Sequence, residues 1–149
     1  MKAKKIRPKR KPLPSIASLQ LKLDNLFQTW VRKSEADEGG TVSCVTCGKL
    51  MHWTGDGAQA GHFVKRQHKG VRYDKRNVHT QCVYCNKYLS GNDGAYAVYI
   101  IDRYGREVHD ELVSWKHKEH KYYRSDYEQL IEKYQELNRE LDKRLPRKD

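Results

Sequence analysis

The sequence predicts an α+β protein in which a small zinc-bound core is flanked by helices. Two Cys-x-x-Cys pairs, Cys44 with Cys47 and Cys82 with Cys85, bracket a glycine-punctuated stretch that can support only short strands and loops. Amphipathic helix patterns precede and follow this stretch. At 149 residues, the chain is long enough for one compact unit with extensions.

The composition indicates nucleic acid as the partner. The net charge is +11 and the charged fraction is 33%, and clustered Lys and Arg bind phosphate backbones by releasing counterions. Because the sequence has no run of about 18 apolar residues and no apolar signal-peptide core, we expect a soluble intracellular protein without a membrane partner. The low mean hydropathy, −0.99, indicates that a structural metal or long solvent-exposed helices supplement a small core.

The first segment, residues 1–14, is predicted to be a flexible basic arm. Three prolines interrupt it, so neither a helix nor a packed strand is expected. The arm either binds phosphates or only makes the chain soluble. Its cationic residues are Lys2, Lys4, Lys5, Arg7, Lys9, Arg10 and Lys11.

Residues 15–40 contain an amphipathic helix that starts at Ser15 or Ser18 and ends near Gly39. Its apolar stripe belongs to the core and carries no chemistry. The stripe is formed by Leu19, Leu23, Leu26, Phe27, Trp30 and Val31.

The C-terminal region, residues 91–149, is predicted to be helical. One helix runs from about Gly94 to Tyr104 and a second from Glu107 to about Trp115. A final helix over residues 125–145 begins with a capping box of Ser125 and Glu128. Its narrow apolar seam either packs on helices of its own chain or pairs with a second copy in a homodimer. The seam consists of Tyr127, Leu130, Tyr134, Leu137 and Leu141.

The core, residues 41–90, is organised by its four cysteines. In a reducing compartment such pairs are metal ligands more often than disulfides, and four thiolates complete a closed tetrahedral zinc site. Such a site has no free position, so the zinc is expected to hold the fold together. Thirty-four residues separate Cys47 from Cys82, against roughly 15 to 20 in a simple zinc ribbon, so something is inserted between the two pairs.

The inserted segment resembles a nuclease motif. "GHF" at residues 61–63, Asn77, and "CVYCN" ending at Asn86 look like the HNH, or ββα-metal, endonuclease motif. The wider pattern, with "LFQTWVR", "CVTCGK", "AGHF", "VRYDKRNVHTQCVYCN" and "SGN", is similar to the NinG family. This is the recombination protein Rap family of lambdoid phages, whose members are structure-specific nucleases for branched DNA.

This resemblance implies a metal-dependent endonuclease that cleaves Holliday junctions and D-loops, in the cytoplasm of a bacterial host and associated with its nucleoid. His62 would be the general base, and histidine near its ordinary pKa suits that task. Asn77 would steady the loop and orient His62. Asn86, on a helix directly after Cys85, would hold a catalytic Mg²⁺ or Mn²⁺.

The sequence departs from the commoner motif at Gly61, where most HNH enzymes place an acidic metal ligand before the catalytic histidine. The partner of Asn86 at the metal therefore stays open among Asp56, Asp74 and His79.

A basic loop between His62 and Asn77 supplies the expected DNA surface. No recognition helix or repeated finger is present, so we expect the protein to recognise the shape of DNA. The residues expected to contact DNA are Lys65, Arg66, Lys69, Arg72, Lys75 and Arg76.

Two alternatives remain open at this point. The chain could be a noncatalytic zinc-finger module that binds nucleic acid and tolerates loss of His62. It could also be a recombination adaptor that dimerises through Tyr127 to Leu141 and has little salt-sensitive affinity for DNA.

Overall fold

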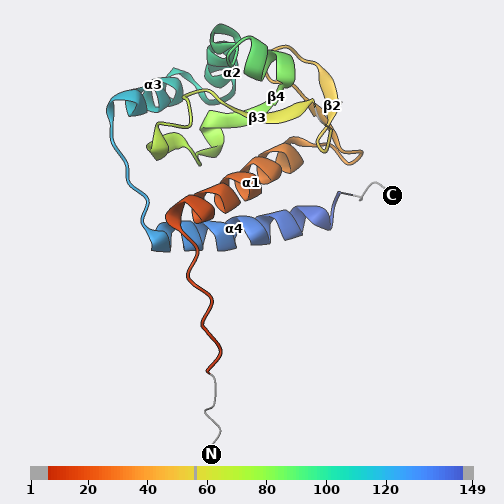
Figure 1. Cartoon of the computed structure of the whole chain (residues 1–149). Coiled ribbons are helices and arrows are strands. Elements are labelled where there is room, and N and C mark those ends of the chain that lie inside the picture. The colour runs from red at the N-terminus through yellow and green to blue at the C-terminus, as the bar shows by residue number, and fades with distance from the viewer. Residues whose placement is uncertain (1–6, 56, 146–149) are drawn as a thin grey trace, which may run out of the picture.

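The computed structural model describes residues 7–55 and 57–145 and contains both helices and short strands, which confirms the α+β class. A central hairpin of β3 and β4 separates two helical layers (Figure 1). Helices α2 and α3 lie on one side of it, and α1, backed by α4, lies on the other. The helices are α1 (Ile16–Glu35), α2 (Asp93–Tyr104), α3 (Arg106–Ser114) and α4 (Arg124–Asp142), and the strands are β1 (Thr41–Ser43), β2 (Leu50–His52), β3 (Ala58–His62) and β4 (Val78–Cys82).

The predicted amphipathic helix is confirmed as α1. The Ser15 hydroxyl accepts a hydrogen bond from the Ser18 amide at 3.1 Å and caps the N-terminus. The apolar stripe lies in the core, where Leu23 and Phe27 are 0% and 1% exposed. Helix α1 therefore provides the platform on which both the hairpin and α4 pack.

Helix α4 packs along α1, so its seam takes the intrachain arrangement of the two left open by the sequence. Tyr127 and Tyr134 of the predicted seam are buried in the same core cluster as the α1 stripe, together with Ile131, which the predicted seam did not include. The predicted capping box is wrong, because the N-cap is Tyr123 and the helix begins at Arg124, so Ser125 lies inside the helix. Its first turn is instead closed by Asp126, whose carboxylate accepts a hydrogen bond from the Tyr123 amide at 2.7 Å.

Helices α2 and α3 match the two helices predicted in the middle of the C-terminal region within one residue at each end. Gly105 separates them with φ of +94°, a conformation that other residues rarely adopt. Below them lies a second core cluster that includes Phe63, Val64 and Val71 from the loop after β3. This cluster fixes the loop next to His62.

The register of the central hairpin decides which side chains share a face. Gln59 is paired with Gln81, and Gly61 with His79. Because side chains alternate along a strand, these four positions point toward the α2 side. Val78 points to the opposite side and packs on α1.

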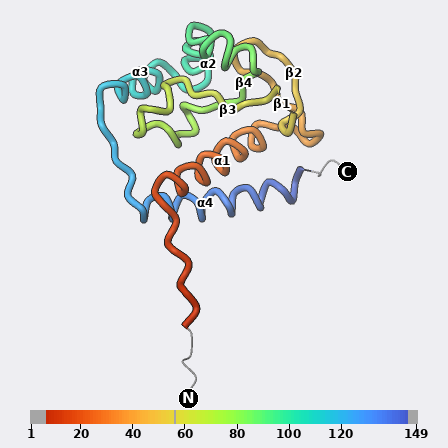
Figure 2. The backbone as a smooth tube through the Cα atoms, viewed as in Figure 1, coloured from red at the N-terminus to blue at the C-terminus, as the bar shows by residue number. Residues whose placement is uncertain are grey.

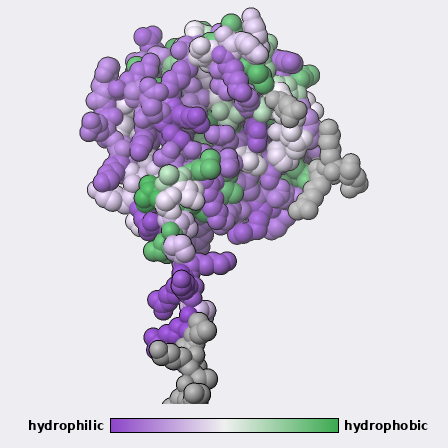
Figure 3. Space-filling model, in the orientation of Figure 1, coloured by the Kyte–Doolittle hydropathy of each residue, from purple (hydrophilic) through white to green (hydrophobic). Residues whose placement is uncertain are grey.

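Residues 7–14 are exposed, belong to no helix or strand, and lead away from the body of the protein (Figure 2). Residues 1–6 of the predicted arm lie outside the described residues. Within the described ranges, no helix has the length and apolar character needed to cross a membrane. The face shown in Figure 3 is mostly hydrophilic, in keeping with the composition.

Candidate functional site

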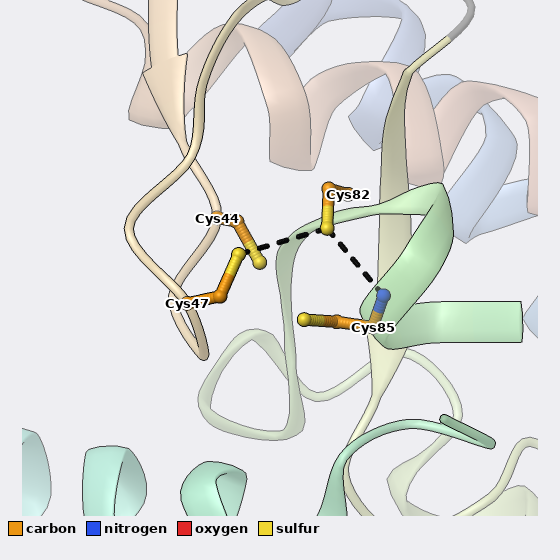
Figure 4. A group of neighbouring side chains, drawn as sticks. All are labelled: Cys44, Cys47, Cys82 and Cys85. Carbon is orange, nitrogen blue, oxygen red and sulfur yellow. Dashed lines mark hydrogen bonds between the residues drawn. The ribbon is translucent and has the colours of Figure 1, made fainter. Parts of the chain in front are cut away.

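The four cysteines converge on one point, as the sequence predicts (Figure 4). Their Sγ atoms all lie within 4.8 Å of one another. Zinc–sulfur bonds of about 2.3 Å in a tetrahedron place the sulfurs roughly 3.8 Å apart, and Cys47 and Cys82 are separated by 3.7 Å. The cluster could therefore hold a structural metal ion such as zinc.

Three parts of the fold meet at this metal centre. Cys44 and Cys47 lie in the turn after β1, Cys82 ends β4, and Cys85 lies in η3 (Tyr84–Tyr88), a single π-helical turn. The Cys85 amide donates to Cys82 Sγ at 3.4 Å, and such N–H groups stabilise metal-bound thiolates. A metal here would join the β1–β2 hairpin to the end of β4 and set the position of η3.

Beside the central hairpin lies an open cleft of ≈ 820 Å³. It is lined by α1, by β3 and the loop that follows it, and by η3, so three distant parts of the sequence build it. Its chemistry-bearing residues are Arg32, His62, Lys65, Arg66, Asn86 and Lys87. Two of the three predicted catalytic residues, His62 and Asn86, are thus brought to one cleft, and the third, Asn77, lies behind it.

The hydrogen bond made by His62 defines its tautomer. Nε2 lies 2.9 Å from the backbone carbonyl of Arg72. Since a carbonyl only accepts, Nε2 carries the proton and Nδ1 keeps its lone pair. Within the described chain Nδ1 makes no hydrogen bond. Burial lowers the pKa of His62 to about 4, assisted by the charges of Arg72 and Arg66. The imidazole is therefore neutral at neutral pH with its lone pair available, but it is a weaker base than the histidine of ordinary pKa expected from the sequence.

Asn77 is fully buried and holds the loop between β3 and β4 together. Its Oδ1 accepts from the Val64 amide at 2.8 Å, and its Nδ2 donates to the carbonyls of Val64 at 2.9 Å and Val71 at 3.1 Å. These bonds satisfy the whole amide. Asn77 therefore shapes the backbone next to His62 without touching the imidazole.

Asn86 lies in η3, immediately after Cys85, and not on a regular α-helix. Its Nδ2 donates to Gln59 Oε1 at 2.8 Å, which sets the orientation of the amide and leaves Oδ1 free to accept. The turn that holds Cys85 at the metal centre thus also presents Asn86 to the cleft.

Two of the three open candidates for a second metal ligand near Asn86, Asp74 and His79, do not line the cleft. The Asp74 carboxylate is bound by Arg76, and the His79 imidazole is buried against Glu35, with Nδ1 and the carboxylate oxygen 2.6 Å apart. Asp56 lies outside the described residues.

The basic loop is only partly available to DNA. Arg66 lines the cleft and Lys69 is exposed beside it. Lys65 also lines the cleft, but its ammonium pairs with the Asp93 carboxylate at 2.9 Å. Lys75 is held by Glu35 at 2.6 Å, and Arg76 by Asp74 and Glu111 at 2.7 and 2.9 Å. Lys75 and Arg76, which the sequence predicts to contact DNA phosphates, are therefore already paired with carboxylates of the protein.

Arg72 corrects the predicted DNA surface, because it is 8% exposed and forms a two-bond ion pair with Asp24 of α1. Nε lies 3.0 Å from Oδ1 and Nη2 lies 2.6 Å from Oδ2. Sequence reasoning could not find the partner, which lies 48 residues earlier in the chain. Arg72 therefore joins the loop to α1 and holds the carbonyl that orients His62.

We expect Arg72→Ala to lower the free energy of unfolding by about 3–5 kcal/mol, because it leaves the Asp24 charge buried and unpaired. Arg66→Ala, at an exposed position six residues away, should change it by less than about 0.5 kcal/mol. Urea denaturation with saturating zinc measures both. Equal stabilities of the two variants would contradict the structural role of Arg72.

Sequence reasoning missed Arg32, which belongs to the helix assigned only to the core. Its guanidinium lines the cleft and donates to the Ala58 carbonyl at 3.3 Å, but Nε is buried without a partner and no described carboxylate pairs with it. Burial lowers its pKa. Burying a cation without a paired acid is costly, so binding of an anion beside Arg32 would be favourable.

A second hollow of ≈ 680 Å³ adjoins the cleft and shares Gln67 with it. It lies between the loop after β3 and the segment after α3, whose "KHKEHK" run carries several cations. The cations that line it are Lys69, Lys116, Lys118 and Lys121.

The fold and the site together define a small α+β protein with a four-cysteine metal centre beside a basic, histidine-containing cleft. Its sequence matches the family described as "Bacteriophage Lambda NinG protein" over residues 1–144, and the chain belongs to this family. It is 34% identical to Protein ninG of Escherichia phage 933W and 32% identical to that of Escherichia phage lambda, in each case over 113 residues. These residues are 75% of this chain and 52% of each relative, so the chain spans about half the length of the curated relatives that it matches. No solved structure matches the chain.

Proposed function

We propose that this protein is an HNH-type endonuclease that hydrolyses phosphodiesters in branched DNA during phage recombination. The observation that carries the proposal is the meeting of His62, whose Nδ1 is free to accept a proton, with Asn86 and Arg32 in one basic cleft. The resemblance to the NinG family adds the substrate, a Holliday junction or a D-loop, and a place of action at the bacterial nucleoid.

In this mechanism His62 Nδ1 removes a proton from the attacking water. The Arg72 carbonyl holds the ring through Nε2, and Asn77 holds the loop that carries this carbonyl. Asn86 Oδ1 is a neutral oxygen donor, which suits Mg²⁺ or Mn²⁺. The chemistry that such an ion supplies when bound is relief of negative charge on the phosphoryl and leaving oxygens.

The rate of cleavage should remain nearly constant as pH falls through 6.5 and should decline only as pH approaches about 4. The reason is that burial lowers the pKa of His62 to about 4, so the proton-accepting form persists well below the ordinary titration range of histidine. A pH profile of kcat/KM, with zinc content checked at each pH, measures this. A half-maximal rate at pH 6.5 or above in zinc-loaded protein would contradict it.

Phosphates of the bound strand would contact Arg32 and Arg66, and the second hollow would receive a neighbouring DNA arm. Replacing Arg32 with Gln is expected to weaken DNA binding and to reduce the slope of log K against log salt by about 0.9, the loss of one phosphate contact. Arg139→Gln is the control, since Arg139 pairs with Glu136 on the exposed side of α4. Equal salt slopes for both variants would show that Arg32 does not contact a DNA phosphate.

Symmetric cleavage of a four-way junction needs two active sites, so we propose that the protein acts as a homodimer on that substrate. Tyr127 and Tyr134 of the α4 seam are buried against α1. A dimer would therefore use another surface.

The decisive experiment incubates the zinc-loaded protein with an end-labelled four-way junction and with a linear duplex of matching sequence, in Mg²⁺ or in a chelator too weak to remove the zinc. We expect nicks near the branch point only with Mg²⁺. If the junction is bound but stays intact in both Mg²⁺ and Mn²⁺, the protein is a noncatalytic zinc-binding module, an alternative favoured by the absence of an acid at Gly61.

A further inference from the structure

The side chain of Gln81, on β4, has a buried amide oxygen without a hydrogen-bond partner in the described chain. Gln81 is 0% exposed. The orientation of the amide is well determined, because Nε2 donates to the Gly91 carbonyl at 2.8 Å and to Thr46 Oγ1 at 3.2 Å. Because both partners accept hydrogen bonds, the amide end that contacts them is the nitrogen, and the other end is the unbonded oxygen Oε1.

Oε1 points at Gly61, across the hairpin. A Cβ atom at position 61 would lie only 1.9 Å from Gln81 Oε1 and 3.1 Å from Asn86 Oδ1. The two amide oxygens therefore border the same small volume, which the missing side chain of Gly61 leaves open. Any larger residue at position 61 would collide with Gln81.

We infer that Gln81 is the second protein ligand of the catalytic divalent ion, together with Asn86, an inference that rests on the proposed nuclease function. Mg²⁺ and Mn²⁺ prefer oxygen donors, and two oxygens on one such ion are roughly 3–4 Å apart. Since both oxygens lie within 3.1 Å of the same point beside Gly61, Gln81 Oε1 and Asn86 Oδ1 are close enough to share one ion. The amide of Gln81 takes the place of the acidic side chain that position 61 lacks.

The surrounding contacts make both oxygens suitable ligands. Gln59 holds the Asn86 amide by its nitrogen, as Gly91 and Thr46 hold that of Gln81. Each ligand is thus oriented by a hydrogen bond behind it, which is typical of metal sites. Because Cys82 and Cys85 adjoin the two ligands in sequence, the structural metal would set the spacing of the catalytic one.

The test measures Mn²⁺ binding to the zinc-loaded full chain without DNA, by the loss of the free Mn²⁺ signal in electron paramagnetic resonance. We expect Gln81→Ala to weaken Mn²⁺ binding at least about tenfold, since even partners behind a ligand contribute about 10- to 100-fold. The double variant Gly61→Asp with Gln81→Ala should regain the affinity, because removing Gln81 opens the space for an acidic ligand at position 61.

The matched control is Asn138→Ala, which removes another buried amide oxygen without a partner, on α4 and far from the cleft in the chain. It should leave Mn²⁺ binding unchanged, and zinc content and thermal melting confirm that each variant is folded. Mn²⁺ affinity of Gln81→Ala within twofold of the unaltered protein would overturn the inference, as would no Mn²⁺ binding by the unaltered protein at millimolar concentration.

The binding assay separates this inference from the proposed function. If Gln81→Ala loses Mn²⁺ but the unaltered protein cuts no DNA, the ion site stands and the nuclease fails. If the unaltered protein cuts DNA and Gln81→Ala binds Mn²⁺ normally, the nuclease stands and Gln81 serves only to hold Thr46 and Gly91.

Discussion

Replacing His62 with alanine is expected to lower the rate of junction cleavage by about 10²- to 10⁴-fold, the usual contribution of a general base. The variant should still bind zinc and the junction, because His62 contributes one hydrogen bond to the fold, to the Arg72 carbonyl. Single-turnover cleavage of a labelled junction, with binding measured in parallel, gives both quantities.

A second variant separates loss of the base from loss of the hydrogen bond. His62→Gln can still donate to the Arg72 carbonyl but has no nitrogen that accepts a proton at neutral pH. We expect it to be as inactive as His62→Ala. His52→Ala is the control, because His52 lies at the end of β2 and does not line the cleft. Cleavage by His62→Ala within threefold of the unaltered protein would disprove the assignment of His62.

Removing the structural zinc is expected to unfold the core. Structural zinc sites contribute apparent free energies of about 10–16 kcal/mol, against a net stability of about 5–15 kcal/mol for a whole domain. Here the four thiolates join the turn after β1 to the end of β4 and to η3. Thermal melting followed by circular dichroism, with zinc removed by a strong chelator or by Cys82→Ser, should show loss of the cooperative transition.

Adding metals back to the chelated protein distinguishes the structural zinc ion from the proposed catalytic Mg²⁺. Zinc should restore the cooperative melting transition of the chelated protein, whereas Mg²⁺ should not, because thiolates bind the softer ion and magnesium prefers oxygen. An unchanged melting temperature after complete zinc removal would show that the cysteine cluster does not hold the fold together.

The helices could be predicted well because their signals are local. The apolar stripe of α1 and Gly105 between α2 and α3 mark these elements within a few consecutive turns. The predicted start of α4 was wrong because Ser125 and Asp126 both carry side chains that can cap a helix. Whether Glu128 or Asp126 accepts the hydrogen bond from the N-cap amide depends on the path of the chain before the helix.

By itself, the sequence determined the four-cysteine cluster, because two closely spaced ligand pairs are typical of one metal site. The pairing of His62 with Asn86 at one site was expected only from the family resemblance. Only the tertiary structure decided which cations are free. Arg72 is paired with Asp24 from α1, whereas Arg32, on the same helix, has no described acid beside it. The role of Gln81 depends on the hairpin register that sets it beside Gly61. Such pairings join residues far apart in the chain, and no spacing within one segment encodes them.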